Sequence, residues 1–198
     1  MGQISYIKQQ VKRENRFSVY VDGKYVFSLA RDQLVQLGLK VGQDLSSDDV
    51  SRFKEASSLG KLRDLTYKWL SIRPRSDFEI SQYLNRKTDD TELVEKIKQE
   101  LKDYGYINDN KFAEAWVRGR TATKPMSSYR LRQELIQKRV PKEVINEVIG
   151  SSSHDDLAAA KEVVAKRSTR YKDKQKLMAY MSRQGFSYDV IKQALETD

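Results

Sequence analysis

The stretch GYINDNKFAEAWVRGR (105–120) ends an apolar helical pattern in two arginines, Arg118 and Arg120. Guanidinium groups hold phosphates and carboxylates through pairs of parallel N–H donors. Arginines near the end of a helix also complement the negative end of the helix dipole without binding any ligand. This stretch alone leaves both interpretations open, and the recurrence of the pattern along the chain has to decide between them.

Basic side chains concentrate in the second half of the chain. The formal net charge is +9, and residues 109–198 contribute 18 basic and 12 acidic side chains to it. The basic residues continue through the segments between the expected helices, where the dipole argument is weak, so the pattern favours a polyanionic partner. A merely soluble basic protein stays open as the alternative. We name the candidate binding residues the basic stripe: Arg118, Arg120, Arg130, Arg132, Lys138, Arg139, Lys166, Arg167, Arg170, Lys172, Lys174 and Lys176.

Acidic pairs are the other residues whose spacing could do chemistry, because paired carboxylates can hold magnesium in a nuclease. Each pair lies just before an expected helix, where acidic side chains stabilise the helix start. The single histidine, His154, has no second histidine as a co-ligand, and no GxxxxGK, GxSxG or HExxH motif is present. We therefore predict no catalytic residue, no metal ligand and no cofactor. The pairs are Asp48 with Asp49, Asp89 with Asp90, and Asp155 with Asp156.

The composition excludes several classes of protein. There are no cysteines, so disulfides, thiol catalysis and cysteine-bound zinc are excluded. No run approaches the roughly 18 apolar residues of a membrane span, and the N-terminus lacks the apolar core of a signal peptide, so we expect a cytoplasmic protein. Charged residues make up 33% of the chain. A chain this polar favours a series of thin helical modules over one thick core.

The N-terminal 58 residues predict a β-rich extension. Asp22-Gly23 is typical of a type I′ hairpin turn, and the flanking runs predict a small antiparallel meander. A short helix is expected over 30–37, stopped by Gly38, followed by a loop over 41–49. From about residue 47 onward every segment has helical periodicity. The three β-rich runs are ISYIKQQV (4–11), RFSVYV (16–21) and KYVFSL (24–29).

The helical part of the chain repeats itself. A shift of 47 residues aligns Trp69 with Trp116, and a shift of 46 aligns Leu131 with Leu177. A shift of 51 aligns the second helices of the first two units, because the segment TATKPMSS is four residues longer than its counterpart. Regular stacking of such units would bring their basic residues to one common side. We predict three units of three helices each, over residues 59–107, 108–150 and 154–197.

Local signals set the expected helix ends. SDFE, beginning at Ser76, is a capping-box pattern, and Asp109 can cap the helix that follows it. Pro141 suits the start of a third helix. Gly105 and Gly185 close helices at positions that need a left-handed backbone.

The aromatic residues divide into two groups. Trp69, Trp116, Phe112 and Phe186 lie on apolar faces and are expected to pack in the core. Tyr129 and Tyr171 lie inside basic segments. They could stack on unpaired bases or serve as half-buried anchors, and the sequence leaves both open.

These residues resemble those of the RecX family, bacterial regulators of the RecA recombinase. GYINDNKFAEAWVRGR is similar to the family pattern GY-(apolar)-x-D-x-x-(F)-A-…-R. RPRSDFEISQYLNRK (73–87) resembles the pattern of its first unit, and LRQELIQKRV (131–140) resembles the second-unit counterpart. The resemblance covers about residues 59–195, and the β-rich N-terminus resembles the extension of members from Gram-positive bacteria. Arg139 stands where the family usually has glycine, which leaves the conformation of that turn open.

The resemblance implies a mainly α fold, with three-helix tandem repeats in an elongated, curved array and a small N-terminal β-meander. It implies a non-enzymatic modulator, chiefly an inhibitor, that docks in the helical groove of the RecA–single-stranded DNA filament. There it would restrain ATP hydrolysis, strand exchange and filament growth. The implied partners are the RecA filament and single-stranded DNA, with double-stranded DNA left open. We expect a monomer without cofactor and without membrane contact.

Two other functions stay open from the residues alone. Three-helix units resemble helix-turn-helix modules, so a stand-alone DNA-binding regulator is an alternative. It needs a recognition helix rich in base-reading side chains, and the third-helix sequences EVINEVI and DVIKQAL are poor in them. A structure-selective nuclease built on the acidic pairs is the other, and it predicts magnesium-dependent cleavage that is lost on Asp155→Asn or Asp89→Asn.

Overall fold

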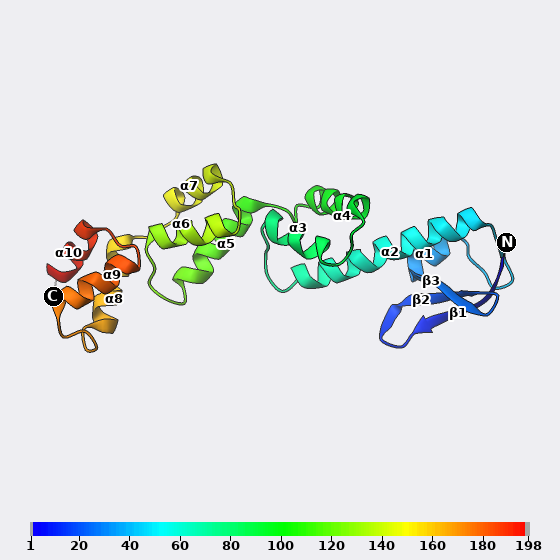
Figure 1. The fold of residues 1–198 in the computed structure, drawn as a ribbon, viewed down its shortest axis with the longest axis horizontal. Helices are drawn as coiled ribbons and strands as arrows, with labels where there is room; N and C mark the ends of the chain where they lie inside the picture. Colours follow the sequence, from blue (N-terminus) through cyan, green and yellow to red (C-terminus); the bar gives the residue numbers. More distant parts are fainter. Residues whose placement is uncertain (1, 197–198) are drawn as a thin grey trace. The chain divides into compact units, whose positions relative to one another are not determined.

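The computed structural model describes residues 2–196 and shows a small antiparallel sheet followed by helices (Figure 1). The chain divides into two compact units, one made of residues up to 72 with 87–97 and the other of 73–86 with residues from 98 onward. The strands are β1 (Gly2–Gln10), β2 (Arg13–Val21), β3 (Lys24–Ala30) and β4 (Asp44–Leu45). The helices are α1 (Arg31–Gln36), α2 (Ser47–Leu70), α3 (Asp77–Asn85), α4 (Thr91–Asp103), α5 (Asp109–Thr121), α6 (Ser128–Gln137), α7 (Lys142–Ser151), α8 (Asp156–Arg167), α9 (Lys174–Arg183) and α10 (Tyr188–Glu196).

The N-terminal sheet has the order β3-β2-β1-β4, and all of its pairs are antiparallel. Asp22 (φ 49°) and Gly23 (φ 78°) both have positive φ, as a type I′ turn between β2 and β3 requires. The predicted three-stranded meander is therefore confirmed. The segment expected to be a loop contains the two-residue strand β4, which pairs with the start of β1 through Gly2 and Leu45. Strand β4 is held by hydrogen bonds to β1, which is distant in the sequence, so no local sequence pattern predicts it.

A buried arginine joins the sheet to the long helix α2. Only 2% of Arg16 is exposed, and its guanidinium donates to the carbonyl oxygen of Ser28 at 2.8 Å and pairs with Asp64 of α2 at 3.0 Å. A Cβ on Gly60 would lie 3.2 Å from the same guanidinium, so glycine at this helical position gives the arginine room. The apolar core between sheet and helix includes Phe27 and Phe53. Burial of a charged group with its partners fixes one orientation of the helix on the sheet.

Helix α2 runs without interruption from Ser47 to Leu70. The Ser46 hydroxyl caps its start by accepting from the backbone N–H of Asp49, and the Asp49 carboxylate accepts from the backbone N–H of Ser46. The expected division between extension and first repeat, at residues 58 and 59, lies inside this helix. The extension and the first repeat thus share one continuous element.

The second and third repeats are three-helix units, as predicted, and each has its own core. Helices α5, α6 and α7 enclose a cluster that includes Phe112, Leu131 and Ile145. Helices α8, α9 and α10 enclose a cluster that includes Met181 and Phe186. The core roles predicted for Phe112 and Phe186 are confirmed, and Trp116 packs against the first cluster while partly exposed.

Several helix ends follow the sequence signals and one does not. Gly105 (φ 70°) and Gly185 (φ 86°) have the expected left-handed backbone, and Arg139 (φ 57°) adopts it as well, so the turn keeps its conformation without glycine. The prediction that Asp109 caps α5 is wrong. The N-cap is Asn108, whose side chain accepts from the backbone N–H of Lys111 at 2.9 Å. Asp109 bonds to another helix, because a neighbouring helix start offers it a free N–H group.

Candidate functional site

Successive repeats are joined by equivalent hydrogen bonds. The hydroxyl of Ser76 donates to the carbonyl oxygen of Lys138 at 2.9 Å, and the hydroxyl of Ser127 donates to that of Gln184 at 2.7 Å. Both serines are buried N-caps, of α3 and α6. We name the two contact regions junction 1–2, between α3 and the second repeat, and junction 2–3, between α6 and the third repeat.

A second pair of bonds repeats in the same way. The Asp109 carboxylate accepts from the backbone N–H of Asp77 at 3.1 Å, and the Asp156 carboxylate accepts from that of Ser128 at 2.7 Å. Each bond satisfies a helix-start N–H of the preceding repeat. Burial raises the pKa of Asp109, although the hydrogen bond from Asp77 opposes this.

The acidic pairs lie at helix starts, as expected. Asp90 accepts from the backbone N–H of Leu93 at 3.0 Å, and Asp155 accepts from that of Leu157 at 2.8 Å. His154 lies 3.1 Å from Asp156. Within residues 2–196 no group of three or more potential metal-ligating side chains is found.

At junction 1–2 a glutamate is held by two cations. Arg73 forms a two-pronged ion pair with Glu79 at 2.9 and 3.0 Å, and the Lys138 ammonium lies 2.7 Å from the same carboxylate. Burial alone would raise the pKa of Glu79, but the hydrogen bonds from Arg73 and Lys138 outweigh it and lower the pKa to about 2. Ser76 does cap α3, but Glu79 does not complete the expected capping box, since its carboxylate is committed to these cations.

A second glutamate, Glu134, pairs with Arg120 at the end of α5. The Arg120 Nε donates to Glu134 at 2.7 Å, and the Trp116 indole N–H donates to the same carboxylate at 3.0 Å. Burial raises the pKa of Glu134, and the bonds from Arg120 and Trp116 outweigh it, so the pKa lies below its usual value. The Arg120 pair in turn raises the pKa of the guanidinium. Arg73, Arg120 and Lys138 all lie within 6 Å of the Trp116 ring centre.

Junction 2–3 has the same framework with different side chains. The repeat alignment places Lys124 and Pro125 opposite Arg73 and Pro74, and Val163 opposite Trp116. It also places Arg130 opposite Glu79 and Tyr180 opposite Glu134. Both carboxylates of junction 1–2 are therefore replaced, one by an arginine and one by a tyrosine.

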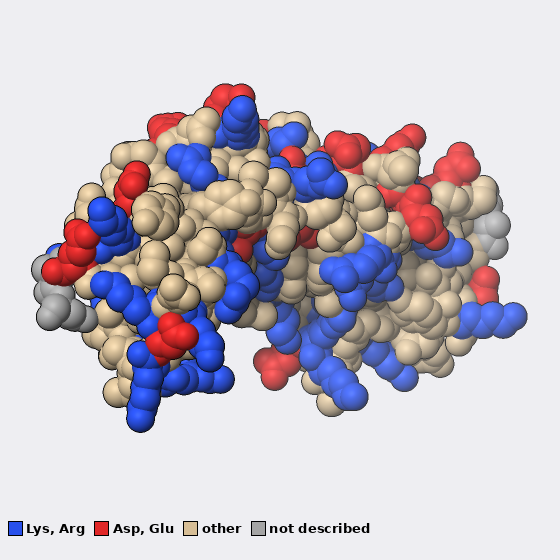
Figure 2. Space-filling model, turned by 60° about the vertical axis from the view of Figure 1, so that its left-hand side comes forward, with Lys and Arg blue, Asp and Glu red and all other residues tan. Residues whose placement is uncertain are grey.

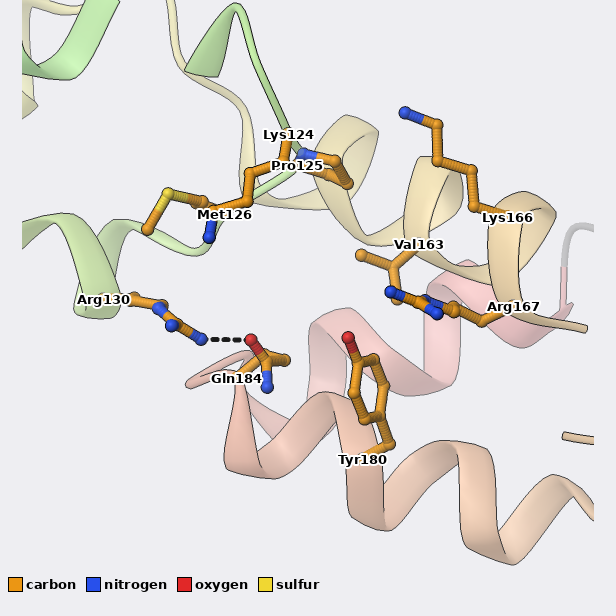
Figure 3. A pocket seen from close by; sticks show the side chains of 9 residues that line it. All are labelled: Lys124, Pro125, Met126, Arg130, Val163, Lys166, Arg167, Tyr180 and Gln184. Atoms are coloured by element: carbon orange, nitrogen blue, oxygen red, sulfur yellow. Dashed lines mark hydrogen bonds between the residues drawn. The ribbon is translucent and has the colours of Figure 1, made fainter. Parts of the chain in front are cut away.

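The replacements open a basic cavity at junction 2–3. Its volume is about 320 Å³, against about 80 Å³ for the pocket at junction 1–2 that is lined by Arg73, Pro74, Phe112, Ala115 and Trp116. The wall carries the cations Lys124, Arg130, Lys166 and Arg167 together with Tyr180 and Gln184 (Figure 3).

The residues of the basic stripe differ in exposure. Figure 2 shows a group of Lys and Arg side chains at the lower left of the face in view. Arg139 lies over the ring of Phe78 and Arg170 over that of Tyr171, at 5.8 and 6.0 Å. The partly buried members are Arg120, Arg130, Arg132, Lys138 and Arg167. The exposed members are Arg118, Arg139, Lys166, Arg170, Lys172, Lys174 and Lys176.

Sequence reasoning missed Glu79, Glu134 and Tyr180. The repeat alignment could have identified them, because it places Glu79 opposite Arg130 and Glu134 opposite Tyr180. Of the two tyrosines left open, Tyr171 packs against the third core and stacks on Tyr180 at 5.3 Å, so it is a half-buried anchor. Tyr129 is 59% exposed.

No helix within the described residues is long and apolar enough to span a membrane.

Comparisons with known proteins give one consistent result. Three family models match: the regulatory protein RecX N-terminal domain over residues 2–46, and the second and third RecX three-helix domains over 108–149 and 154–195. The regulatory protein RecX of Bacillus subtilis (strain 168) is 31% identical, over 98% of this chain and 76% of the relative. That of Bacillus licheniformis is 33% identical, over 100% of this chain and 78% of the relative.

Solved structures agree with this result. A crystal structure of regulatory protein RecX superposes with a TM-score of 0.74 at 27% identity, covering 99% of this chain and 100% of that one. RecX from Lactobacillus salivarius has a TM-score of 0.63 at 21% identity, covering 72% and 97%. The second match supports the fold alone.

Proposed function

We propose that this chain, which belongs to the RecX family of regulatory proteins, is a non-enzymatic modulator of the RecA recombinase. It binds in the helical groove of the RecA–single-stranded DNA filament and restrains ATP hydrolysis, strand exchange and filament growth. The observation that carries the proposal is the family match, which extends over the sheet and two helical repeats and confirms the resemblance to the RecX family.

The repeated junction bonds support a partner that is itself repetitive. The Ser76 and Ser127 bonds place consecutive repeats in equivalent contacts. In repeat proteins such nearest-neighbour contacts set the rotation from one unit to the next. A filament groove offers equivalent binding positions at regular intervals, and stacked units can engage several of them at once.

The basic stripe supplies the attraction in this proposal. Exposed residues such as Lys172, Lys174 and Lys176 carry charge into solvent, where they accelerate encounter with a polyanionic fibre. Arg120 and Lys138 differ, because Glu134 and Glu79 already pair with them. We assign Lys138 chiefly to holding junction 1–2 and Arg120 to holding α5 against α6, and assign DNA or RecA contact to the remaining members of the basic stripe.

The test is the ATPase activity of RecA on single-stranded DNA with increasing amounts of this protein, with the DNA examined on a gel afterwards. The proposal expects ATP hydrolysis to fall while the DNA stays intact. Unchanged hydrolysis at saturating protein would contradict it and would favour a stand-alone DNA-binding regulator. Magnesium-dependent cleavage of the DNA would instead favour the nuclease.

A further inference from the structure

We propose that the cavity at junction 2–3 holds one nucleotide of an unpaired DNA strand. Its phosphate lies between Arg130 and Arg167, and its sugar and base lie against Tyr180. The inference deepens the proposed function and rests on it, since it assumes that DNA within the filament is a ligand. It assigns a chemical task to a cavity that the basic stripe alone does not define.

The cavity is built for an anion. Among the described residues that line it none is acidic, while four carry a positive charge. The Arg130 guanidinium donates to the Oε1 of Gln184, a neutral acceptor, which holds it across the cavity (Figure 3). The charge of Arg130 also helps to lower the pKa of Glu134, but the Glu134 carboxylate accepts its hydrogen bonds from Arg120 and Trp116. A phosphate can therefore receive further donors from Arg130.

Arg167 is positioned by an aromatic ring. Its guanidinium lies 5.7 Å from the centre of the Tyr180 ring, and Figure 3 shows both side chains facing the same space. Tyr180 is fixed in turn by its stack on Tyr171. Lys166 is bonded to Glu162, and in Figure 3 it extends away from the Arg130–Gln184 bond. The two arginines are thus the cations best placed to hold a ligand inside the cavity.

Comparison of the two junctions separates this site from ordinary basic surface. At junction 1–2 the Arg73–Glu79 pair neutralises itself and Trp116 occupies the space. At junction 2–3 the positions of that ion pair carry Lys124 and Arg130, and the smaller Val163 replaces the tryptophan. The contacts that close the first pocket are therefore absent from the described lining of the second. The result is a larger cavity with a higher positive charge.

The size and walls of the cavity favour a nucleotide over a carboxylate. A volume of about 320 Å³ lies at the lower end of the range for small-molecule sites, well above what one carboxylate needs. Tyr180 offers the edge of its ring and its hydroxyl, because Tyr171 stacks on the ring and the Arg167 guanidinium lies over it. The sugar and the base edge of a nucleotide can pack against such a group. Paired bases are stacked inside a duplex, so only an unpaired strand can bring a nucleotide into the cavity.

The test measures binding of a fluorescein-labelled oligothymidine of about twenty nucleotides by fluorescence anisotropy, without RecA. The pocket variant Arg130→Gln/Arg167→Gln is compared with Arg183→Gln/Lys192→Gln, which removes the same charge from exposed positions outside the cavity and outside the basic stripe. The inference expects a loss of about tenfold or more for the pocket variant and about twofold or less for the control. For a DNA duplex of the same length, both variants should lose the same amount of affinity. Equal losses on oligothymidine would overturn the inference.

A second variant closes the cavity without changing any charge. Val163→Trp copies the residue that fills junction 1–2, so affinity for oligothymidine should fall at constant net charge. Circular dichroism shows whether this variant keeps its helices, and if it does not, the arginine pair decides alone. Wild-type affinity in a folded Val163→Trp variant would contradict the inference.

Photo-crosslinking provides a readout that a structural role would not move. An oligonucleotide with 5-iodouracil in place of thymine should form its main adduct on Tyr180, identified by mass spectrometry. A main adduct on exposed Tyr129 or Tyr188 would place the bases elsewhere and overturn the assignment. Binding of a polyglutamate peptide that is lost in the pocket variant, with DNA binding unchanged, would assign the cavity to an acidic protein partner instead.

These measurements separate the inference from the proposed function. If the wild-type protein fails to inhibit RecA but the pocket variant loses oligothymidine, the cavity assignment stands and the modulator proposal falls. If the wild-type protein inhibits RecA and the pocket variant binds oligothymidine as the control does, the reverse holds.

Discussion

Arg139 in the second repeat and Gly185 in the third occupy equivalent positions, and both have a left-handed backbone, with φ of 57° and 86°. Arg139 sends its side chain over the ring of Phe78. Gly185 instead lies against Tyr129, the equivalent of Phe78, and a Cβ there would come within 2.6 Å of the ring. The backbone requirement is shared, whereas the space for a side chain is not.

This relationship predicts different outcomes for the same substitution. Gly185→Ala adds a Cβ that clashes with Tyr129 and with the Ser127 hydroxyl, and it also strains a left-handed residue. We expect it to lower the free energy of unfolding by about 2 kcal/mol or more. Arg139→Ala keeps a Cβ that the structure already accommodates, so it should cost less than about 1 kcal/mol. Urea unfolding followed by circular dichroism measures both, and equal costs would refute the explanation.

Ser127 should contribute more to stability than a helix cap alone. Its hydroxyl accepts from the backbone N–H of Arg130 and donates to Gln184 of the next repeat, all in a buried setting. Ser127→Ala should therefore lower the free energy of unfolding by about 2 kcal/mol, the sum of a cap and a buried hydrogen bond.

Ser187→Ala is the matched control, because Ser187 is exposed and its hydroxyl makes only a long bond of 3.4 Å to the Val190 N–H within its own repeat. It should cost about 1 kcal/mol or less. The same urea titration compares the two, and a Ser127→Ala cost no larger than the control would remove the inter-repeat contribution.

Glu79 makes stability depend on pH in the acidic range. Its pKa is about 2 in the folded protein, against a reference value of 4.5, so its contribution is fully present above about pH 4.5 and is lost as the pH falls toward 2. Solvent screening at this partly exposed site reduces the contribution to about 1–2 kcal/mol. Wild type and Glu79→Gln should therefore differ in unfolding free energy at pH 7 and converge near pH 2. A difference that persists at pH 2 would contradict the ion-pair account.

Elements with a local cause could be predicted from the sequence. The Asp22-Gly23 turn and the left-handed Gly105 and Gly185 were predicted because a backbone with positive φ favours glycine and, at turns, aspartate. The three-helix repeats were predicted because their apolar positions recur with a fixed shift. The core roles of Phe112 and Phe186 followed from the same periodicity.

Features decided by distant neighbours could not be predicted. Asp109 has the sequence context of an N-cap, but the free N–H of Asp77, from the preceding repeat, takes its carboxylate. Arg120 and Lys138 have the sequence context of free cations, and the fold places a glutamate against each. Which cations are neutralised depends on carboxylates that come close only when the helices pack. The sequence pattern shows where the basic residues lie, but not which of them form ion pairs.

Two glutamates neutralise cations at junction 1–2, so removing these carboxylates should increase the affinity for DNA. Glu79→Gln/Glu134→Gln releases Arg73, Arg120 and Lys138 from their partners. Oligothymidine affinity should rise several-fold, more than for Glu143→Gln/Glu147→Gln, which removes two exposed carboxylates of α7. Anisotropy at one salt concentration makes the comparison. Equal gains would mean that net charge alone matters and that these cations do not face DNA.

Salt dependence tests whether the basic stripe contacts phosphates at all. If about four to six phosphates are contacted, the logarithm of the oligothymidine binding constant should fall with the logarithm of salt concentration with a slope of about −3 to −5. The Arg130→Gln/Arg167→Gln variant loses one phosphate site, so its slope should be shallower by about one, while the Arg183→Gln/Lys192→Gln control keeps the wild-type slope. A flat response in the wild type would remove direct phosphate contact and leave RecA itself as the source of affinity. A shared slope for wild type and the pocket variant would show that any phosphates contacted lie outside the cavity at junction 2–3.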